Sequence, residues 1–466
     1  MPVRLIAIIF MLLTTPVQSE DAGNAFSAEM LDTSLKLRQL AVGNPTGYTI
    51  VESLTTEVGP RLAGSPAEAR ARDWAVEELS SLGFENVRIE EFKVPLWRRG
   101  RQSARILSPF PQPLTITALG GSVGTGPEGV EGEIVTFASL SALSSADKDE
   151  VSGKIVFIDE TMTRTQDGSG YSVAAKKRRE TAYEAHRLGA KAALIRSVGT
   201  SSHRFAHTGQ MHRASNDDLV DSVPTAALAA PDADQLARVQ ERGLPVFVKL
   251  VLETQTEPAS ISGNVIAEIP GRERPEEIVL ISAHLDSWDL GTGAIDDGAG
   301  VGIVIGAAKL LLDSLAQAPK RTIRVVLFGA EEVGLVGAKA YAERHADQLN
   351  NHVVGTESDF GAGDIWRFDT RFGEKALAIS EQFSKALKPL GIAPGHNTAT
   401  GGPDMLFIRE AGVPVVTLAQ NGWDYFDLHH TANDTLDKIG PSDLDQNIAA
   451  FAVFTYLAAE TDAYFR

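Results

Sequence analysis

The sequence predicts an α/β protein: a mixed sheet with helices on both faces, interrupted by a strand-rich inserted domain. From about residue 263 onward, apolar runs of strand length alternate with helical patterns, which is typical of a layered α/β sheet. The block from about residue 107 to 257 is strand-rich. These observations divide the chain into a leader (1–19), a first part of the main domain (25–106), the inserted domain (107–258) and a second part of the main domain (259–466).

The main domain is predicted to begin with helices at 46–57 and 67–82, and Gly83 stands where the second helix would end. In its second part, helical spacing predicts a helix at 301–315 and another after Phe372. Apolar runs predict strands at 265–269, 278–283, 322–328 and 413–418.

The inserted domain is predicted to hold an amphipathic helix at 172–188, which ends at Gly189. The basic run Lys176-Lys177-Arg178-Arg179 lies in this helix, and we expect it to be a solvated helix face. Strands are predicted at 114–119, 153–159, 192–195 and 246–252.

Composition narrows the classes of function. The 466 residues are 43% hydrophobic, enough for two or three domains with a sizeable core. The net charge of −18 disfavours nucleic acid and anionic membrane surfaces as partners, because both require a basic face. The absence of cysteine excludes disulfides and thiolate-ligated zinc.

The N-terminus has the pattern of an export signal. Arg4 precedes the apolar run 5–13, and Val17-Gln18-Ser19 offers small side chains for cleavage near Ser19. The apolar run is short for a permanent membrane span. We therefore expect an exported protein, periplasmic or secreted, without a stable membrane anchor; an uncleaved N-terminal anchor is the alternative.

Histidine and carboxylate residues follow two of the predicted strands directly. His284 follows the strand at 278–283, at the sheet edge where ligands bind in open α/β sheets, and Asp286 could reach its second ring nitrogen. Glu331 and Glu332 follow the strand at 322–328, and adjacent carboxylates repel each other unless a cation intervenes. One could bind a metal while the other takes a proton from water.

Further candidates lie in the following loops and helix starts. Asp296 and Asp297 open the helix near 301, where they could act as helix caps, although beside His284 the first resembles a bridging carboxylate. Asp359 is another candidate ligand. His429 and His430 lie in a loop, where one would bind metal, oriented by Asp434 or a threonine hydroxyl.

Imidazole and carboxylate groups are the usual nitrogen and oxygen ligands of catalytic zinc. Two metals a few Å apart need about this many ligands, including one carboxylate that bridges. The set therefore has the composition of a two-zinc hydrolytic site. Its members are His284, Asp296, Glu331, Glu332, Asp359 and His430.

In their order along the chain, these motifs resemble the co-catalytic zinc exopeptidases, which include bacterial aminopeptidases and plasma glutamate carboxypeptidase (carboxypeptidase Q). The latter is the closer match because of the string His284-Leu285-Asp286-Ser287-Trp288-Asp289. Residues 153–159 and 189–195 look like parts of a protease-associated domain. The resemblance spans most of the mature chain, and it implies a zinc exopeptidase domain that acts on short peptides with two Zn²⁺ ions per chain.

The resemblance also implies roles for single residues. Asp296 would bridge both zinc ions, and Glu331 would be the general base, with Asp286 as a second catalytic residue beside His284. A cis peptide bond is implied between Asp296 and Asp297. One zinc site would be completed by His284 and Asp359, and the other by Glu332 and His430, for which His429 is the alternative.

Several points stay open. The metal ligands contact only the scissile amide, so they do not distinguish an aminopeptidase from a carboxypeptidase or dipeptidase. A glutaminyl cyclase-like acyltransferase with one zinc and a non-catalytic binding protein are the competing classes. Residues 401–404 are expected near the specificity pocket, and a homodimer is implied, both by resemblance alone. The loop histidines could bind a further metal or contact substrate; they are His203, His207 and His212.

Overall fold

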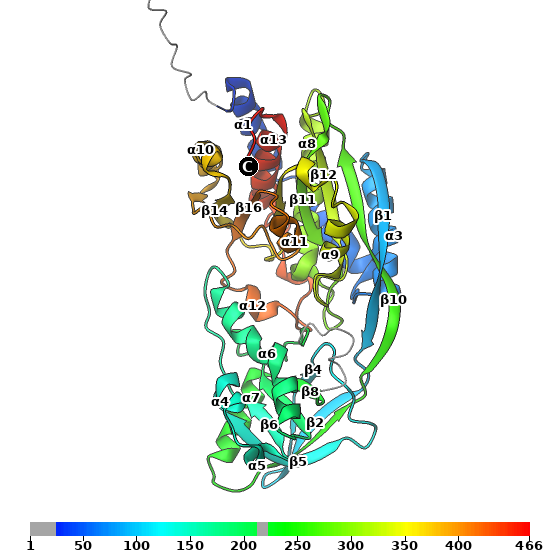
Figure 1. Ribbon diagram of the computed structural model, residues 1–466, viewed down its shortest axis with the longest axis vertical. Helices are drawn as coiled ribbons and strands as arrows, with labels where there is room; N and C mark the ends of the chain where they lie inside the picture. The colour runs from blue at the N-terminus through cyan, green and yellow to red at the C-terminus, as the bar shows by residue number, and fades with distance from the viewer. Residues whose placement is uncertain (1–24, 212–221) are drawn as a thin grey trace, which may run out of the picture.

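The computed structural model describes residues 25–211 and 222–466, so the predicted leader lies outside the described residues. Figure 1 shows two parts, each built around a sheet, joined along one side by the long strands β1 and β10. Within the described ranges, no helix combines the length and the apolar character needed to cross a bilayer.

The main domain contains a mixed eight-stranded sheet in the order β1-β10-β12-β11-β13-β16-β14-β15. The four strands β12, β11, β13 and β16 are parallel, whereas β1 and β10 pair antiparallel with their neighbours. Strand β14 pairs antiparallel with β16 and parallel with β15. The bounds are β1 Glu85–Arg98, β10 Gln255–Ile269, β11 Arg274–His284, β12 Arg321–Phe328, β13 His352–Glu357, β14 Ile365–Arg371, β15 Ala393–Pro394 and β16 Val415–Gln420. The predicted mixed sheet is confirmed, and the four strands predicted in this part lie within or overlap β10, β11, β12 and β16.

Helices cover both faces of this sheet, as predicted. Apolar side chains of one face pack against six helices: α1 Ala28–Ala41, α2 Thr46–Ser53, α3 Pro66–Ser81, α8 Ala299–Ser314, α10 Leu377–Leu387 and α13 Asp445–Glu460. The other face packs against α9 Val336–Arg344 and α11 Leu406–Glu410. Twelve of the sixteen residues of α8 are buried, so the sheet and its helices hold the start of α8 firmly in place.

The second sheet has the order β3-β2-β9-β5-β6-β7-β8-β4. Its strands are β2 Gln102–Ser108, β3 Gln112–Leu114, β4 Ile116–Ala118, β5 Val130–Phe137, β6 Ile155–Ile158, β7 Ala192–Arg196, β8 Thr225–Leu228 and β9 Phe247–Leu252. On one face lie α4 Leu140–Ser144, α5 Lys148–Val151 and α6 Ser169–Arg187, and on the other lies α7 Ala230–Gln240. Strand patterns thus predominate here, as the sequence indicates.

The expectation of a single strand at 114–119 is wrong. The chain forms β3, which pairs with β2, and then β4, which pairs with β8 at the opposite edge of the sheet. Between them, the Thr115 N–H donates to the Asp232 carboxylate at 3.1 Å instead of to a neighbouring strand. Alternation of apolar residues cannot reveal this change of partner, because both strands keep the same pattern.

A pH-dependent contribution to stability follows from His352, at the start of β13. Its Nδ1–H donates to the Gln348 carbonyl at 3.0 Å, and its Nε2 lies 2.8 Å from the Tyr341 hydroxyl. Burial lowers the pKa of His352 to about 3. In the unfolded chain this residue has a pKa near 6.5, so as the pH falls the unfolded chain binds the proton before the folded chain does. The folded state therefore loses about 1.36 kcal/mol of stability per pH unit.

We therefore expect His352→Gln to be less sensitive to acid than the wild type between pH 6.5 and pH 3. The denaturant midpoint should fall less steeply with decreasing pH in this variant. His203→Gln, at an exposed position, should keep the wild-type slope. Equal slopes for His352→Gln and the wild type would contradict the account.

Candidate metal centre and active site

The candidate site lies at the carboxyl ends of the four parallel strands. His284 is the last residue of β11, and Glu331 and Glu332 follow β12. Asp359 follows β13 by two residues, and the histidine pair follows β16 and the short helix α12, Tyr425–Leu428. Asp296 comes from the turn Ala294–Gly298 that precedes α8. Parallel strands therefore bring together residues that are separated by up to about 150 positions in the sequence.

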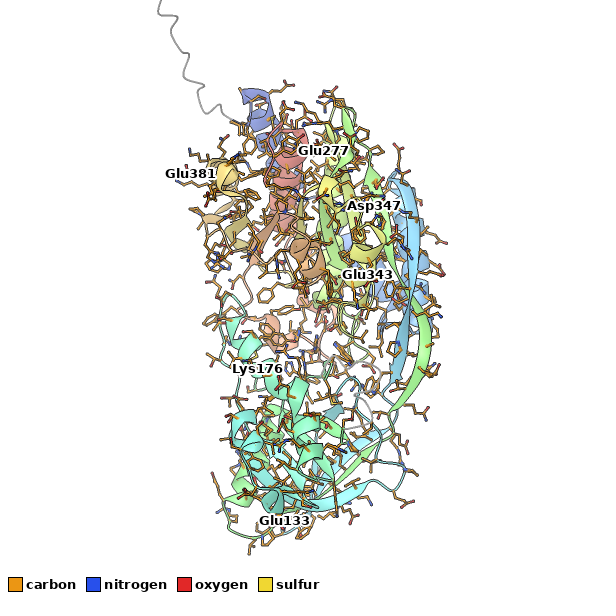
Figure 2. The ribbon with its side chains drawn as sticks, viewed as in Figure 1. Glu133, Lys176, Glu277, Glu343, Asp347 and Glu381 are labelled. Carbon is orange, nitrogen blue, oxygen red and sulfur yellow. The ribbon has the colours of Figure 1, made fainter. Side chains whose placement is uncertain are left out.

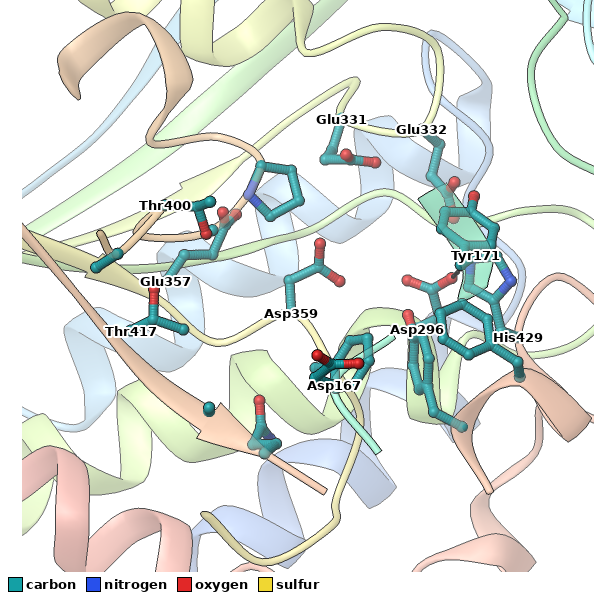
Figure 3. Close-up of a pocket in the computed structure, with 18 of the residues that line it drawn as sticks. Asp167, Tyr171, Asp296, Glu331, Glu332, Glu357, Asp359, Thr400, Thr417 and His429 are labelled. Carbon is teal, nitrogen blue, oxygen red and sulfur yellow. Dashed lines mark ion pairs between the residues drawn. The ribbon is translucent and has the colours of Figure 1, made fainter. Parts of the chain in front are cut away.

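Asp296 stands between two sets of side chains. Its Oδ1 lies 3.1 Å from His284 Nε2, which in turn lies 3.5 Å from Asp359 Oδ1. Its Oδ2 lies 3.1 Å from His430 Nε2, which lies 2.9 Å from Glu332 Oε2. All five residues predicted as metal ligands thus converge, with one Asp296 oxygen facing each imidazole. Figure 3 shows three of them, Asp296, Glu332 and Asp359, at the wall of one pocket.

Two neighbouring carboxylates fix the turn that carries Asp296. Asp434 accepts the N–H groups of Ile295 at 2.6 Å and of Asp296 at 3.2 Å. Asp297 accepts the N–H of His284 at 3.1 Å and that of Gly300 at 3.0 Å. The peptide bond between Asp296 and Asp297 is cis, as the resemblance implied.

The carboxylate of Asp286 has a different place from the one expected. His284 donates its Nδ1–H to the backbone carbonyl of Asp286 at 2.9 Å, whereas the Asp286 carboxylate lies 3.8 Å away. That carboxylate accepts the N–H groups of Glu331 at 3.0 Å and Glu332 at 3.3 Å. Asp286 therefore leaves His284 Nε2 free to bind a metal and also positions the glutamate pair.

The shifted pKa values of the buried side chains indicate that the site binds cations. Burial raises the pKa of Glu332 to about 7 and that of Glu331 well above its usual range; the nearby imidazoles lower both pKa values and the neighbouring carboxylates raise them. Burial would lower the pKa of His430, but Glu332 and Asp296 raise it to about 9. Glu332 Oε1 is buried and has no hydrogen-bond partner. Nitrogen and oxygen donors crowded in this way fit zinc ions, which would neutralise the repulsion.

Of the two loop histidines, His430 contacts both Asp296 and Glu332. The His429 ring stacks on it, with centroids 3.4 Å apart, and its Nε2 lies 3.6 Å from Asp296 Oδ2. No contact joins His429 to Glu332 among the ion pairs of the described residues. His429 instead packs against aromatic rings of Tyr171, Tyr425 and Phe426.

The inserted domain holds the histidine loop directly. His207 donates from Nδ1 to the His429 carbonyl at 2.7 Å, and the Thr208 N–H donates to the His430 carbonyl at 3.0 Å. In return, His430 Nδ1 lies 3.3 Å from the Thr208 carbonyl. We expected Asp434 or a threonine hydroxyl to orient the ligand histidine. The group that lies next to His430 Nδ1 is instead the Thr208 carbonyl of the inserted domain. A Cβ on Gly209 would lie 2.8 Å from His430 Nδ1, so the main chain of the inserted domain can come this close to His430 only with glycine at position 209.

The other loop histidines of the inserted domain do not join His207. His203 is exposed, with its ring near Phe205, and His212 lies outside the described residues. His207 itself faces the histidine loop and not the cavity. The described part of the chain therefore offers no second metal site in this loop.

A cavity of about 540 Å³ opens onto the candidate site. Glu331, Glu332, Asp296 and Asp359 are among its lining residues. Its wall from the inserted domain includes Asp167, Tyr171, Arg178, Arg179, Gln210 and Met211. From the loop expected near the specificity pocket, Gly402 and Pro403 line the cavity.

The expectation that residues 176–179 form a solvated helix face is wrong for its central residues. Lys176 is exposed at the surface (Figure 2), but Lys177 and Arg178 are buried. The Lys177 Nζ donates to the Glu160 carbonyl. Arg178 faces the cavity, donates to the Tyr171 hydroxyl at 2.6 Å and lies 3.5 Å from His430 Nδ1. The helix pattern alone could not show that Lys177 packs against its own domain and that the main domain covers Arg178.

Comparison with known proteins agrees with the geometry. The sequence profile of peptidase family M28 matches residues 264–455. The chain is 37% identical to carboxypeptidase Q of Bos taurus and 36% identical to that of Homo sapiens, over 89% of this chain and 85% of each relative. A solved structure of a peptidase M28 precursor from Shewanella amazonensis is 48% identical, with a TM-score of 0.91 over 94% of this chain and 98% of that one. A zinc aminopeptidase from Bacillus subtilis has the same fold, with 20% identity and a TM-score of 0.65 over 90% of this chain and 96% of that one.

The contact between the two domains generates a prediction about metal binding. His207→Phe keeps a ring but removes the donor to the His429 carbonyl, so we expect metal affinity to fall by about 10- to 100-fold, as for other residues that orient ligands. Titration of the metal-free protein with zinc measures this. His203→Phe, on the same loop, should bind zinc as the wild type does; unchanged affinity in His207→Phe would show that the loop contact does not orient the ligand.

Proposed function

This chain belongs to peptidase family M28 and is a zinc metallopeptidase; on that premise, we propose that it is a two-zinc exopeptidase that recognises the free carboxylate of short peptides. The observation that carries the two-metal proposal is the position of Asp296, with one oxygen facing each imidazole. His284 and Asp359 would complete one site with it, and Glu332 and His430 the other. The coarser activity, hydrolysis of peptides by a zinc enzyme, already follows from the family.

Glu331 is suited to move the proton. Bound zinc supplies a Lewis acid and lowers the pKa of water from about 15.7 to about 7. Glu331 lines the cavity beside the ligand Glu332, and its N–H is held by Asp286. Its carboxylate would accept a proton from the attacking water and return it to the leaving amine, a role that typically contributes about 10² to 10⁴ in rate.

Arg178 supports the proposal that the enzyme reads a carboxylate. Its side chain is 93% buried at the cavity wall, and its Nε has no hydrogen-bond partner. In the described residues, no carboxylate pairs with it. A buried guanidinium without a counterion is costly, and its planar donors match a carboxylate in two parallel hydrogen bonds. The terminal carboxylate of a peptide is an anion of this shape.

The carboxypeptidase Q relatives favour the same direction of cleavage over that of the aminopeptidases. Zinc per chain distinguishes the remaining classes: a cyclase-like acyltransferase would be complete with one ion, and a binding protein would not hydrolyse peptides when zinc is replete. We also propose that the enzyme is exported, because its N-terminal sequence has the pattern of a signal peptide.

Two substitutions test the roles at the metal centre. Glu331→Gln should keep its zinc and lose about 10² to 10⁴ in kcat, because only the proton acceptor is removed. Asp296→Ala should lose both zinc and activity, because each site loses a ligand. Zinc content and kcat are measured on the same preparations. An active Glu331→Gln enzyme would assign the proton transfer to another group.

Blocked peptides test the direction of cleavage. The wild type should cleave a short free peptide and fail on its C-amidated form, because amidation removes the anion. Arg178→Met should lower kcat/KM for the free peptide by about 10- to 100-fold, the range for a hydrogen bond to a charged group. Lys176→Gln, exposed on the same helix, is the matched control and should behave as the wild type. Equal cleavage of free and amidated peptides would rule out carboxylate recognition.

A further inference from the structure

Arg61, in the loop that precedes α3, is a buried cation that the mechanism above does not use. Its exposed fraction is 0%. Arginine is almost never fully buried unless an acid pairs with it. Among the described residues, however, the Arg61 side chain donates only to main-chain carbonyl groups. The burial of this charge therefore requires an explanation.

The Arg61 side chain joins the two ends of one segment, residues 285–293. Its Nε donates to the Leu285 carbonyl. Its Nη1 donates to the Thr292 carbonyl at 2.7 Å, and its Nη2 donates to the Gly293 carbonyl at 2.9 Å. A guanidinium is planar and holds its donors in a fixed fork, so these carbonyls cannot separate without breaking a hydrogen bond to a charged group. The segment is thus clamped at both ends.

The clamped segment connects two residues of the metal centre. His284 comes directly before it, and Asp296 lies in the turn that follows it. The Gly293 carbonyl that accepts from Arg61 also accepts the N–H of Gly298 at 3.0 Å, at the end of the same turn. The position of Asp296 relative to His284 therefore depends on the Arg61 side chain.

The segment also packs tightly around Arg61. The Arg61 N–H donates to Ser287 Oγ at 3.2 Å, and the Ser287 N–H donates to the Arg61 carbonyl at 3.2 Å. Gly293 has a φ of 62°, and a Cβ there would lie 2.4 Å from Ser287 Cβ and 2.8 Å from Arg61 Nη1. Only glycine allows the segment to close this tightly on the guanidinium.

Arg61 also supplies a permanent positive charge to the acidic region around the metal centre. Burial lowers the pKa of Arg61, and four nearby acids raise it: Asp434, Asp286, Asp297 and Asp296. A guanidinium stays protonated in proteins. Because its donors are all directed at carbonyls, the carboxylate oxygens stay available to backbone N–H groups and to metal ions.

We propose that Arg61 is a positioning residue of the metal centre: it fixes the distance between His284 and Asp296 by clamping the segment that connects them. The proposal rests on the two-metal site proposed above. The ion held by His284 and Asp359 would have two ligands next to this segment, counting Asp296. The other ion would depend on the segment through Asp296 alone. Arg61 therefore acts mainly on the first ion.

Titration of the metal-free protein with Co²⁺ tests the proposal, because the visible absorbance of Co²⁺ reports the ligand geometry of each ion. Arg61→Lys keeps the positive charge but lacks the planar fork. One of the two binding steps should therefore weaken by about 10- to 100-fold, the range for residues that orient ligands, with a changed spectrum. The other step should stay close to that of the wild type. Saturating zinc should restore most of kcat and leave KM unchanged.

Three further variants show which ion is affected and exclude general damage. Asp359→Asn removes a ligand of the His284 ion alone, so the step that it weakens should be the one that Arg61→Lys weakens. Arg61→Met also removes the charge and should weaken this step further. Arg70→Met is the matched control, because Arg70 is exposed and donates to the Pro66 carbonyl at 3.3 Å; it should bind Co²⁺ as the wild type does.

Unchanged Co²⁺ affinity in Arg61→Lys would overturn the proposal, whether or not Arg61→Met folds. An equal loss in both steps would also overturn it, because that result indicates general damage. A wild type that binds only one ion would instead overturn the two-metal proposal. In that case Arg61→Lys should weaken the single step, and an unchanged step would overturn the role of Arg61 as well.

Discussion

The concentration of buried negative charge around Asp296 is the constraint on which the rest of the structure depends. Seven carboxylates surround two imidazoles at one edge of the sheet, and five of the seven are buried: Asp286, Asp296, Asp297, Glu332 and Asp434 are buried, and Glu331 and Asp359 are partly exposed. Such a group is stable only where the backbone donates hydrogen bonds to the outer acids and cations neutralise the inner ones. Asp286, Asp297 and Asp434 each accept two backbone N–H groups, and they thereby hold the ligand-bearing turns in place.

Much of this could be predicted from the sequence because the sheet itself arranges it. A residue that follows a buried parallel strand must lie at the carboxyl edge, so His284, Glu332 and Asp359 could be grouped before any contact was known. Asp296 and Asp297, at the start of α8, could be added to this group because they follow His284 closely in the sequence. The partner of each side chain was less predictable: periodicity placed Asp286 beside His284, but it could not show whether the main chain or the carboxylate faces the ring.

The contributions of the inserted domain could not be predicted. Arg178 and the turn at His207 precede the histidine loop by more than 200 positions, and nothing in their own segments indicates a metal centre. A helix with four consecutive basic residues has the same pattern whether solvent or another domain covers it. Likewise, the sequence shows Glu357 only as the residue at the end of a strand; that its Oε1 has no hydrogen-bond partner is a property of the tertiary structure alone.

The pairing of β1 with β10 bears on how substrate enters. These strands lead into and out of the inserted domain, and their ladder continues from Glu85 opposite Glu268 to Arg98 opposite Gln255. The domain is thus mounted on a two-stranded ribbon and not on a single flexible linker. A widening of the cavity mouth by movement of the inserted domain would bend or twist this ribbon and would pull Thr208 away from His430. The elastic resistance of the ribbon therefore couples admission of a peptide to the integrity of the catalytic centre.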